Sequence, residues 1–322
     1  MKCVLALATV MAVVACSLDP DDYKSADQLM KDALATLGRA RAVHFTGTFA
    51  QGGHKYEIDL TVTRDGGAKG TVTEDGLNGE LAKSGDRLLL RGQELIKSID
   101  PKLAKLVGDR WLVDTDQSAV KPLAGVIDVP QLQQQLDGRR AGLTRSSTTT
   151  VRGTKLAVLS DRAGSLYVTE KGTTEVTRIT QRPGTALPDG TTDENVNLAY
   201  PSSVDLALPQ KDVVDPNDPK TMPARYILDD FKLDSCDTSG CGMKSVVHNK
   251  AGAPYGPAAA INFTVTAGPK SLGSCTTPLP ALDFDATATV SCRVGGADWS
   301  SFVSGGGGAY TGHVQISNPL YD

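Results

Sequence analysis

The apolar positions of this chain repeat with two different periods, and the change of period separates a predicted helix from predicted strands. Residues 26–40 carry apolar side chains at helical spacing, namely Ala26, Leu29, Met30, Ala33, Leu34, Leu37 and Ala40. This single stripe predicts an amphipathic helix. Ser25 and Gln28 form the capping box that is typical of a helix start. From Val43 onward, apolar and polar residues alternate, which predicts strands.

The alternation is clearest in residues 54–64. There Tyr56, Ile58, Leu60 and Val62 fall on one face, and charged or hydroxyl side chains fall on the other. One apolar and one polar face are typical of an antiparallel sheet. The predicted strands of this first meander, separated by turn residues such as Asp75-Gly76, are 43–51, 54–64, 68–74, 77–83 and 87–91.

A mixed segment precedes a second meander. Residues 93–106 are predicted to be helical despite Pro101, 110–114 to form a short strand around Trp111, and 130–136 to form a short helix. Period-two segments with turn residues between them then return at 143–151, 155–160, 165–170, 174–181 and 194–200. The pattern therefore predicts an α+β domain over residues 25–210.

The last third of the chain begins with a proline-rich segment and continues with short predicted strands. Residues 211–223 contain three prolines and predict a linker. Asp212, Asp215 and Asp218 in this segment lack the spacing and the closing Glu of a calcium loop, so a linker is the favoured interpretation. Short predicted strands follow at 226–234, 243–249, 259–266, 286–293 and 313–317. They predict an immunoglobulin-like β-sandwich over residues 224–322, with Trp299 and Phe302 closing one end.

Composition and charge narrow the classes of partner. The formal net charge is −4, and Lys and Arg are scattered along the chain, so a nucleic acid is not an expected partner. Only 5% of the residues are aromatic, and Gly and Thr are abundant, which suits a β-rich exported protein with many turns.

The first sixteen residues look like an export signal. Lys2 precedes an uncharged apolar run from Val4 to Ala15, which is too short to span a bilayer. Val13-Val14-Ala15-Cys16 resembles the lipobox of bacterial lipoproteins. The resemblance implies that residues 1–15 are removed, that Cys16 is lipidated, and that residues 16–24 form a tether. We therefore expect an exported protein that is lipid-anchored to the outer face of the cell membrane. An ordinary signal peptide with a chance cysteine is the alternative.

Four further cysteines lie in the last third of the chain: Cys236, Cys241, Cys275 and Cys292. An even number of cysteines in an exported protein predicts two disulfides, and the sequence leaves three pairings open. A zinc site is the competing interpretation. It lacks the C-x2-C spacing and a neighbouring histidine, so disulfides are favoured.

Sequence motifs of catalysis are not convincing in this chain. Ser118-Ala119-Val120-Lys121 matches S-x-x-K, but neither S-D-N nor K-T-G accompanies it. The four histidines, His44, His54, His248 and His313, lie far apart in sequence and show no ligand spacing. The sequence also contains no G-x-S-x-G and no nucleotide-binding fingerprint. We therefore expect no enzyme activity, no catalytic residue, no metal and no cofactor.

Residues 25–210 resemble the LolA/LprG/LppX-like lipoproteins of actinobacterial type. The resemblance rests on the order of the elements and on three segments: VHFTGTF, DRLLLRGQELIKSIDPKLAKLVGDRWLVD and KLAVLSDRAGSLYVTEKGTTEVTRITQ. It implies a curved antiparallel half-barrel with helices across its open side and a cavity that holds acyl chains. The implied cavity-lining residues are Ile58, Leu60, Val62, Val72, Leu88, Leu90, Leu156, Val158, Leu166 and Val168. Alternatively, these side chains pack on the first helix and enclose no cavity.

Two functions follow from these expectations. The first is a membrane-anchored carrier or chaperone that binds the acyl part of a lipid or lipoglycan. The second is a non-enzymatic surface protein whose C-terminal sandwich binds a protein or a cell-wall polymer. In both, the fold is mainly β, with a half-barrel followed by a sandwich.

Overall fold

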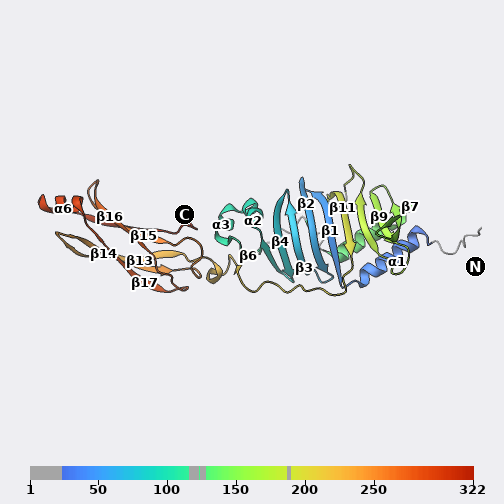
Figure 1. Cartoon of the computed structure of the whole chain (residues 1–322), viewed down its shortest axis with the longest axis horizontal. Coiled ribbons are helices and arrows are strands. Elements are labelled where there is room, and N and C mark those ends of the chain that lie inside the picture. The colour runs from blue at the N-terminus through green and yellow to red at the C-terminus, as the bar shows by residue number, and fades with distance from the viewer. Residues whose placement is uncertain (1–23, 116–122, 124–127, 187–189) are drawn as a thin grey trace, which may run out of the picture.

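The structure is a computed structural model that describes residues 24–115, 123, 128–186 and 190–322. The predicted signal sequence, Cys16, Ser118 and Lys121 lie outside these residues. The chain forms one large curved sheet at one end and a two-sheet sandwich at the other (Figure 1). This arrangement confirms the predicted fold class, a half-barrel followed by a β-sandwich.

The large sheet has twelve strands in the order β12-β6-β5-β4-β3-β2-β1-β11-β10-β9-β8-β7. Its first meander consists of β1 (Ala42–Gln51), β2 (His54–Thr63), β3 (Ala68–Glu74), β4 (Leu77–Ser84), β5 (Arg87–Arg91) and β6 (Trp111–Val113). The second meander consists of β7 (Thr144–Val151), β8 (Thr154–Ser160), β9 (Gly164–Thr169), β10 (Val176–Gln181) and β11 (Thr192–Ala199). The two meanders are joined by antiparallel pairing of β1 with β11.

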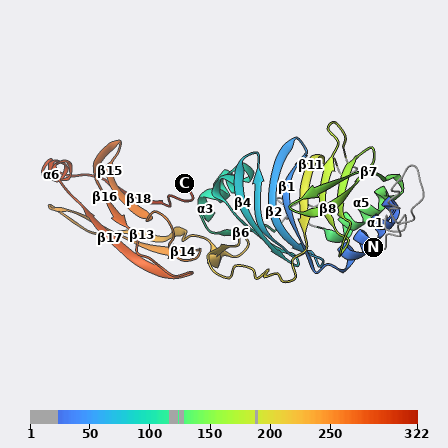
Figure 2. The same ribbon diagram turned by 45° about the vertical axis from the view of Figure 1, so that its right-hand side comes forward.

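Glycines in the strands allow neighbouring backbones to approach closely. Gly47 in β1 has φ +151°, and an added Cβ would collide with the carbonyl of Asn195 in β11. Gly70 in β3 has φ +152°, and its Cβ would collide with the carbonyl of Asp59 in β2. Glycine at such positions is typical of strands that bend. The curvature of the sheet is visible in Figure 2.

Helices α1 (Ala26–Arg39) and α5 (Val129–Arg139) lie across the concave face near β7–β11 (Figure 2). Ser25 is the N-cap of α1 as predicted, because its side chain accepts a hydrogen bond from the backbone N–H of Gln28. The Gln28 side chain donates to Asp32, so the reciprocal bond of the predicted capping box is replaced. Buried side chains of both helices belong to the same core cluster as the concave face of the sheet. The core of the half-barrel is therefore shared between the sheet and two helices.

The predicted helix over 93–106 is two helices, α2 (Gln93–Ile99) and α3 (Pro101–Val107). Proline has no N–H to donate, so it suits the first turn of a new helix better than the interior of a longer one. Asp100 caps α3 by accepting hydrogen bonds from the backbone N–H groups of Lys102 and Leu103. The single long helix was therefore a wrong prediction.

The segment predicted as a linker, 211–223, is ordered against the half-barrel. Val213 and Val214 form β12 (Val213–Val214), which pairs in parallel with β6 at the edge of the large sheet. Val214 is fully buried among side chains of α2, α3 and β6. Asp218 caps the short helix η4 (Pro219–Thr221) and Asp215 accepts a hydrogen bond from the N–H of Asn217. Two of the three aspartates therefore serve as turn acceptors.

The sandwich contains two three-stranded sheets. One has the order β13-β14-β17 and the other β16-β15-β18. Their bounds are β13 (Tyr226–Asp237), β14 (Gly240–Asn249), β15 (Ala260–Ala267), β16 (Lys270–Pro278), β17 (Thr287–Val294) and β18 (Thr311–Ser317), with α6 (Ala297–Ser304) before β18. The sequence analysis did not predict β16, whose small and polar residues carry little apolar alternation.

Both predicted disulfides are present in the sandwich. Cys236 pairs with Cys241 across the β13–β14 hairpin, and Cys275 pairs with Cys292. The second bond links β16 to β17 and so joins the two sheets. Trp299 of α6 is almost fully buried and donates its indole N–H to the carbonyl of Asp237 at 2.9 Å.

Candidate functional site

Eight of the ten predicted cavity-lining residues lie in the buried core cluster of the half-barrel. They are Ile58, Leu60, Val62, Val72, Leu88, Leu90, Leu166 and Val168. The strand register places Ile58 opposite Val72 on the same face. All eight side chains are covered, with at most 6% of each residue exposed.

The other two predicted lining residues point to the opposite face. Leu156 and Val158 pair with Thr169 and Tyr167, whereas their neighbours in β8 pair with the core residues Val168 and Leu166. Strand β8 is apolar on both faces, so its sequence does not show which face is concave. Leu156 and Val158 are therefore withdrawn as cavity-lining residues. Ala157 and Leu159 occupy the concave face in their place.

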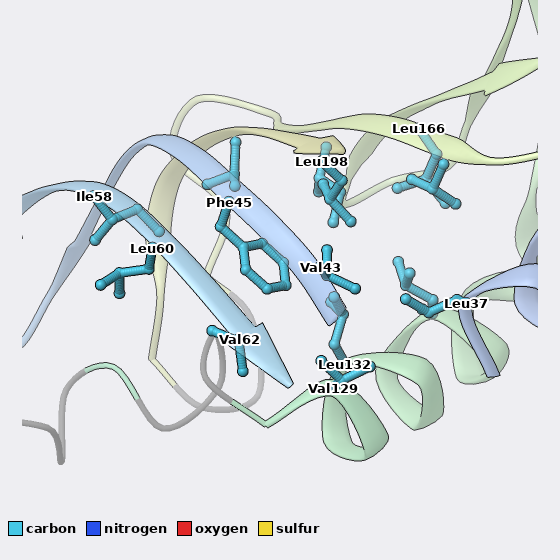
Figure 3. Close-up of a cluster of buried hydrophobic side chains, with 14 of the residues drawn as sticks. Leu37, Val43, Phe45, Ile58, Leu60, Val62, Val129, Leu132, Leu166 and Leu198 are labelled. Atoms are coloured by element: carbon cyan, nitrogen blue, oxygen red, sulfur yellow. The ribbon is translucent and has the colours of Figure 1, made fainter. Parts of the chain in front are cut away.

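Helix side chains fill the hollow where α1 and α5 cross it (Figure 3). Leu37 of α1 and Leu132 of α5 point toward the strands that carry Val43, Phe45 and Leu166. Leu37 is fully buried. In this region the apolar face of the sheet packs on the protein's own helices, which is the alternative to a lipid-filled cavity given in the sequence analysis.

An open pocket of about 850 Å³ lies at the end of this packed region, beside α5. Leu132 and Leu136 of α5 and Ile179 of β10 line it, and all three also belong to the core cluster. Further lining comes from Gln135 and Gly138 of α5, the β8–β9 turn at residues 161–163, Ala186 and Glu194. The pocket therefore borders the packed apolar core of the half-barrel.

An ion pair holds the wall of this pocket in place. The Arg139 guanidinium donates two hydrogen bonds of 2.9 Å to the Asp161 carboxylate, and both side chains are mostly buried. The backbone N–H groups of Ala163 and Gly164 donate to the same carboxylate. Burial alone raises the pKa of Asp161, but the hydrogen bonds from Arg139 and the backbone outweigh it, so its pKa is lowered. The pair thus fixes the end of α5 to the β8–β9 turn.

The rim of the pocket is polar and lies close to the start of α1. Gln134 and the exposed Arg162 line the rim. Arg140, directly after α5, makes an ion pair of 3.2 Å with Asp27 in the first turn of α1. An apolar base with a polar rim matches an amphiphile, whose apolar part enters and whose polar part remains at the mouth.

The four histidines are spread over the structure, as their spacing suggested. His44 and His54 each contact a carboxylate, Asp59 and Asp75, at 2.7 Å on the half-barrel. On the sandwich, His248 lies between Asp229 and Asp285, at 3.1 and 2.7 Å. Among the residues that the structure describes, no group of three or more His, Cys, Asp or Glu side chains has a metal-binding arrangement. Within the same residues, no helix combines the length and apolarity needed to cross a bilayer.

The sequence analysis missed Leu136, Arg139, Asp161 and Ile179. Arg139 and Asp161 are separated by 22 residues and meet only because α5 packs across the sheet. No local pattern links a helix end to a turn of the second meander. The apolar stripe Val129, Leu132 and Leu136, which the predicted helix 130–136 partly contained, was the available signal for the α5 side of the pocket.

Comparisons with known proteins give only distant structural likeness. No protein-family model matches the chain, and no curated protein matches it. Among solved structures, the chain is similar to the crystal structure of LprF from Mycobacterium bovis, with 11% sequence identity and a TM-score of 0.42. The match covers 57% of this chain and 96% of that chain. A likeness at this level leaves the function to be argued from the chain's own residues.

Proposed function

We propose that this protein is an exported lipoprotein, anchored through Cys16, that binds the acyl part of a lipid or lipoglycan in the pocket beside α5. The observation that carries the proposal is the apolar base of that pocket, formed by Leu132, Leu136 and Ile179 of the half-barrel core. Its volume of about 850 Å³ falls within the range of ligand pockets, roughly 300–1,000 Å³.

The hydrophobic effect sets the size of acyl segment that the pocket must accept. Each buried methylene contributes about 0.8 kcal/mol. A dissociation constant of about 1 μM corresponds to roughly −8 kcal/mol. About ten buried methylenes would therefore supply micromolar binding before the cost of ordering the chain is subtracted.

The start of α1, from which the proposed tether extends, lies at the same end of the half-barrel as the pocket. The nine residues 16–24, even when fully extended, span at most roughly 30 Å. The Asp27–Arg140 ion pair connects the first turn of α1 to the residue that follows α5. A lipidated Cys16 would therefore keep the pocket close to the membrane surface, from which an acyl chain could enter.

A pocket-filling substitution tests the proposal. Gly138 lines the pocket, and a Cβ added there meets no atom within 4 Å. Gly138→Phe should therefore place a ring in the mouth without a clash, and helix propensity favours the change. The matched control is Asp137→Phe, because Asp137 is the exposed neighbour on α5 that does not line the pocket.

The assay is fluorescence titration of residues 17–322 with an undecanoic acid that carries a dansyl label. The expected result is micromolar binding by the unmodified chain and by Asp137→Phe, with affinity at least tenfold lower for Gly138→Phe. The proposal is overturned if the unmodified chain does not bind the labelled acid. It is equally overturned if Gly138→Phe and Asp137→Phe bind it with the same affinity.

A further inference from the structure

A second hollow lies where the half-barrel meets the sandwich. It has a volume of about 500 Å³. Asp109, Arg110 and Trp111 line one side, and Ala253, Pro254 and Tyr255 of the sandwich line the other. The segment between the two units supplies Lys211, Asp212, Lys220, Thr221 and Met222. Figure 1 shows α3 and β6 next to the sandwich at this point.

Specific contacts hold the two sides of this junction cleft at a fixed separation. The Arg110 guanidinium stacks on the Tyr255 ring at 3.9 Å. It also donates hydrogen bonds to the carbonyls of Leu106, Val107 and Thr221, at 2.7, 3.2 and 3.3 Å. Gly108, with φ +59°, leaves room for the Tyr255 hydroxyl that a Cβ would displace. The cleft is therefore formed before any ligand arrives.

Contacts of the C-terminus reinforce the junction. The Lys105 ammonium of α3 donates to the Asp322 carbonyl oxygen at 3.0 Å, and the Tyr321 hydroxyl donates to the Pro223 carbonyl at 2.7 Å. These bonds join the last residues of the sandwich to the half-barrel and to the segment between them. A ligand in the cleft would touch both units without having to order them.

The lining of the junction cleft carries more positive than negative charge. Arg91, Arg110, Lys211 and Lys220 line it together with two carboxylates, Asp109 and Asp212. Arg91 is paired with the Glu80 carboxylate of the neighbouring groove, so Lys211 and Lys220 carry most of the excess charge. The three hydrogen bonds of Arg110 all go to backbone carbonyls. Its half-buried position lowers its pKa through loss of hydration. Asp212 compensates part of this charge, and an anionic ligand group would compensate more of it.

A shallow groove continues from the junction cleft over the edge of the half-barrel. It measures about 520 Å³ and shares Arg91 and Asp109 with the cleft. Thr71, Thr73, Asn78 and Gln93 line most of the remainder. The Glu80 carboxylate also lines the groove and forms an ion pair with Arg91. The hydroxyl and amide groups present hydrogen-bond donors and acceptors. Because they share Arg91 and Asp109, the two hollows adjoin and could be occupied by one extended ligand.

We propose that the junction cleft and its groove bind an anionic saccharide chain. The hydroxyl and amide groups match the hydroxyls of successive sugars. Lys211 and Lys220, both exposed, face the carboxylate or phosphate groups. Tyr255 is 37% exposed and offers an aromatic ring to the apolar face of a sugar. No aliphatic or aromatic side chain is among the residues that line the groove, so it offers no such side chain for contact with the side chains of a peptide.

The experiment measures binding to residues 17–322 by isothermal titration calorimetry. The probes are a hexamer of galacturonic acid, maltohexaose and hexaglutamate. The galacturonate hexamer should bind, and the neutral maltohexaose should bind at least tenfold more weakly. Hexaglutamate should also bind at least tenfold more weakly than the galacturonate hexamer.

Lysine variants locate the binding. Lys211→Ala combined with Lys220→Ala should weaken galacturonate binding at least tenfold. The control removes two exposed sandwich lysines outside the cleft, Lys232→Ala with Lys270→Ala, and should leave binding unchanged. All four side chains are exposed, so both variants should fold. The dansyl acid titration should be the same in both variants, which separates this site from the pocket beside α5.

Three outcomes overturn the proposal. The first is failure of the galacturonate hexamer to bind. The second is equal binding of hexaglutamate or of maltohexaose, since the cleft would then select charge alone or no charge at all. The third is an equal loss of affinity in the two lysine variants, which would place the binding elsewhere on the surface.

Discussion

Removal of the Cys275–Cys292 disulfide should destabilise the sandwich and leave the half-barrel unaffected. The bond links β16 to β17, so it joins the two sheets, and its cysteines are 17 residues apart. A crosslink that closes a loop of this length reduces the conformational entropy of the unfolded chain and so raises its free energy by about 3 kcal/mol. Cys275→Ala combined with Cys292→Ala should therefore lower the free energy of unfolding of the sandwich by about 3 kcal/mol.

The two tryptophans of the chain allow each unit to be followed separately. Trp111 lies in the half-barrel and Trp299 in the core of the sandwich. In a Trp111→Phe background, urea unfolding followed by fluorescence reports the sandwich alone. A slope of about 1–3 kcal/mol per M urea converts the expected loss into a midpoint lower by roughly 1–3 M. In a Trp299→Phe background, the half-barrel transition should not move.

The second disulfide provides the matched control. Cys236 and Cys241 are five residues apart and directly opposite each other in the paired strands β13 and β14. The loop that this bond closes is shorter, so replacing both cysteines with alanine should cost about 2 kcal/mol, less than for the inter-sheet bond. Equal midpoints for the Cys275/Cys292 variant and the unmodified sandwich would refute the reasoning. A larger loss in the hairpin variant would refute it as well.

Three further substitutions test the packing and the charges described above. Leu37→Ala should lower the free energy of unfolding of the half-barrel by about 2–5 kcal/mol, because it leaves a cavity at a fully buried site. The control Ile99→Ala removes a half-exposed side chain and should cost far less. The urea midpoints of the two variants measure the difference. Asn249→Ala should cost the sandwich about 3 kcal/mol, measured in the same way, because the buried amide makes five hydrogen bonds to the backbone. Hydrogen bonds from Ser239 lower the pKa of Asp237 to about 2. The pKa of Asp237 is lower in the folded protein than its ordinary value of 3.8. The ionised carboxylate therefore stabilises the folded sandwich above pH 3.8, and this contribution is lost as the pH falls toward 2. Asp237→Asn should remove that acid dependence, and an NMR titration of the Asp237 carboxyl that shows an ordinary pKa would contradict it.

Local periodicity was enough to predict most strands of the half-barrel. In β2, Tyr56, Ile58, Leu60 and Val62 alternate with polar residues, and all four are buried as the pattern indicated. The alternation fails in β8, whose central residues are buried on both faces. The concave side of that strand is set by its pairing with β9. A sequence window of one strand contains no information about that pairing.

The missed features depend on contacts between distant segments. Strand β12 is two residues long and exists because Val213 and Val214 pair with Trp111 and Leu112. The pocket beside α5 similarly requires a helix, a turn and a strand of the second meander to meet. Residues 211–223 read as a linker because proline and aspartate dominate their composition. The pairing partner that orders them lies about one hundred residues earlier.

The half-barrel and the sandwich are arranged end to end, so the sandwich lies far from helix α1. Helix α1 lies at one end of the molecule and the sandwich at the other (Figure 1). Twelve adjacent strands spaced about 4.8 Å apart extend over roughly 50 Å when measured along the curved sheet. With Cys16 in the bilayer, the sheet would act as a spacer that projects the sandwich tens of ångströms outward. One polypeptide would then contact lipid at its base and the more distant layers of the envelope at its tip.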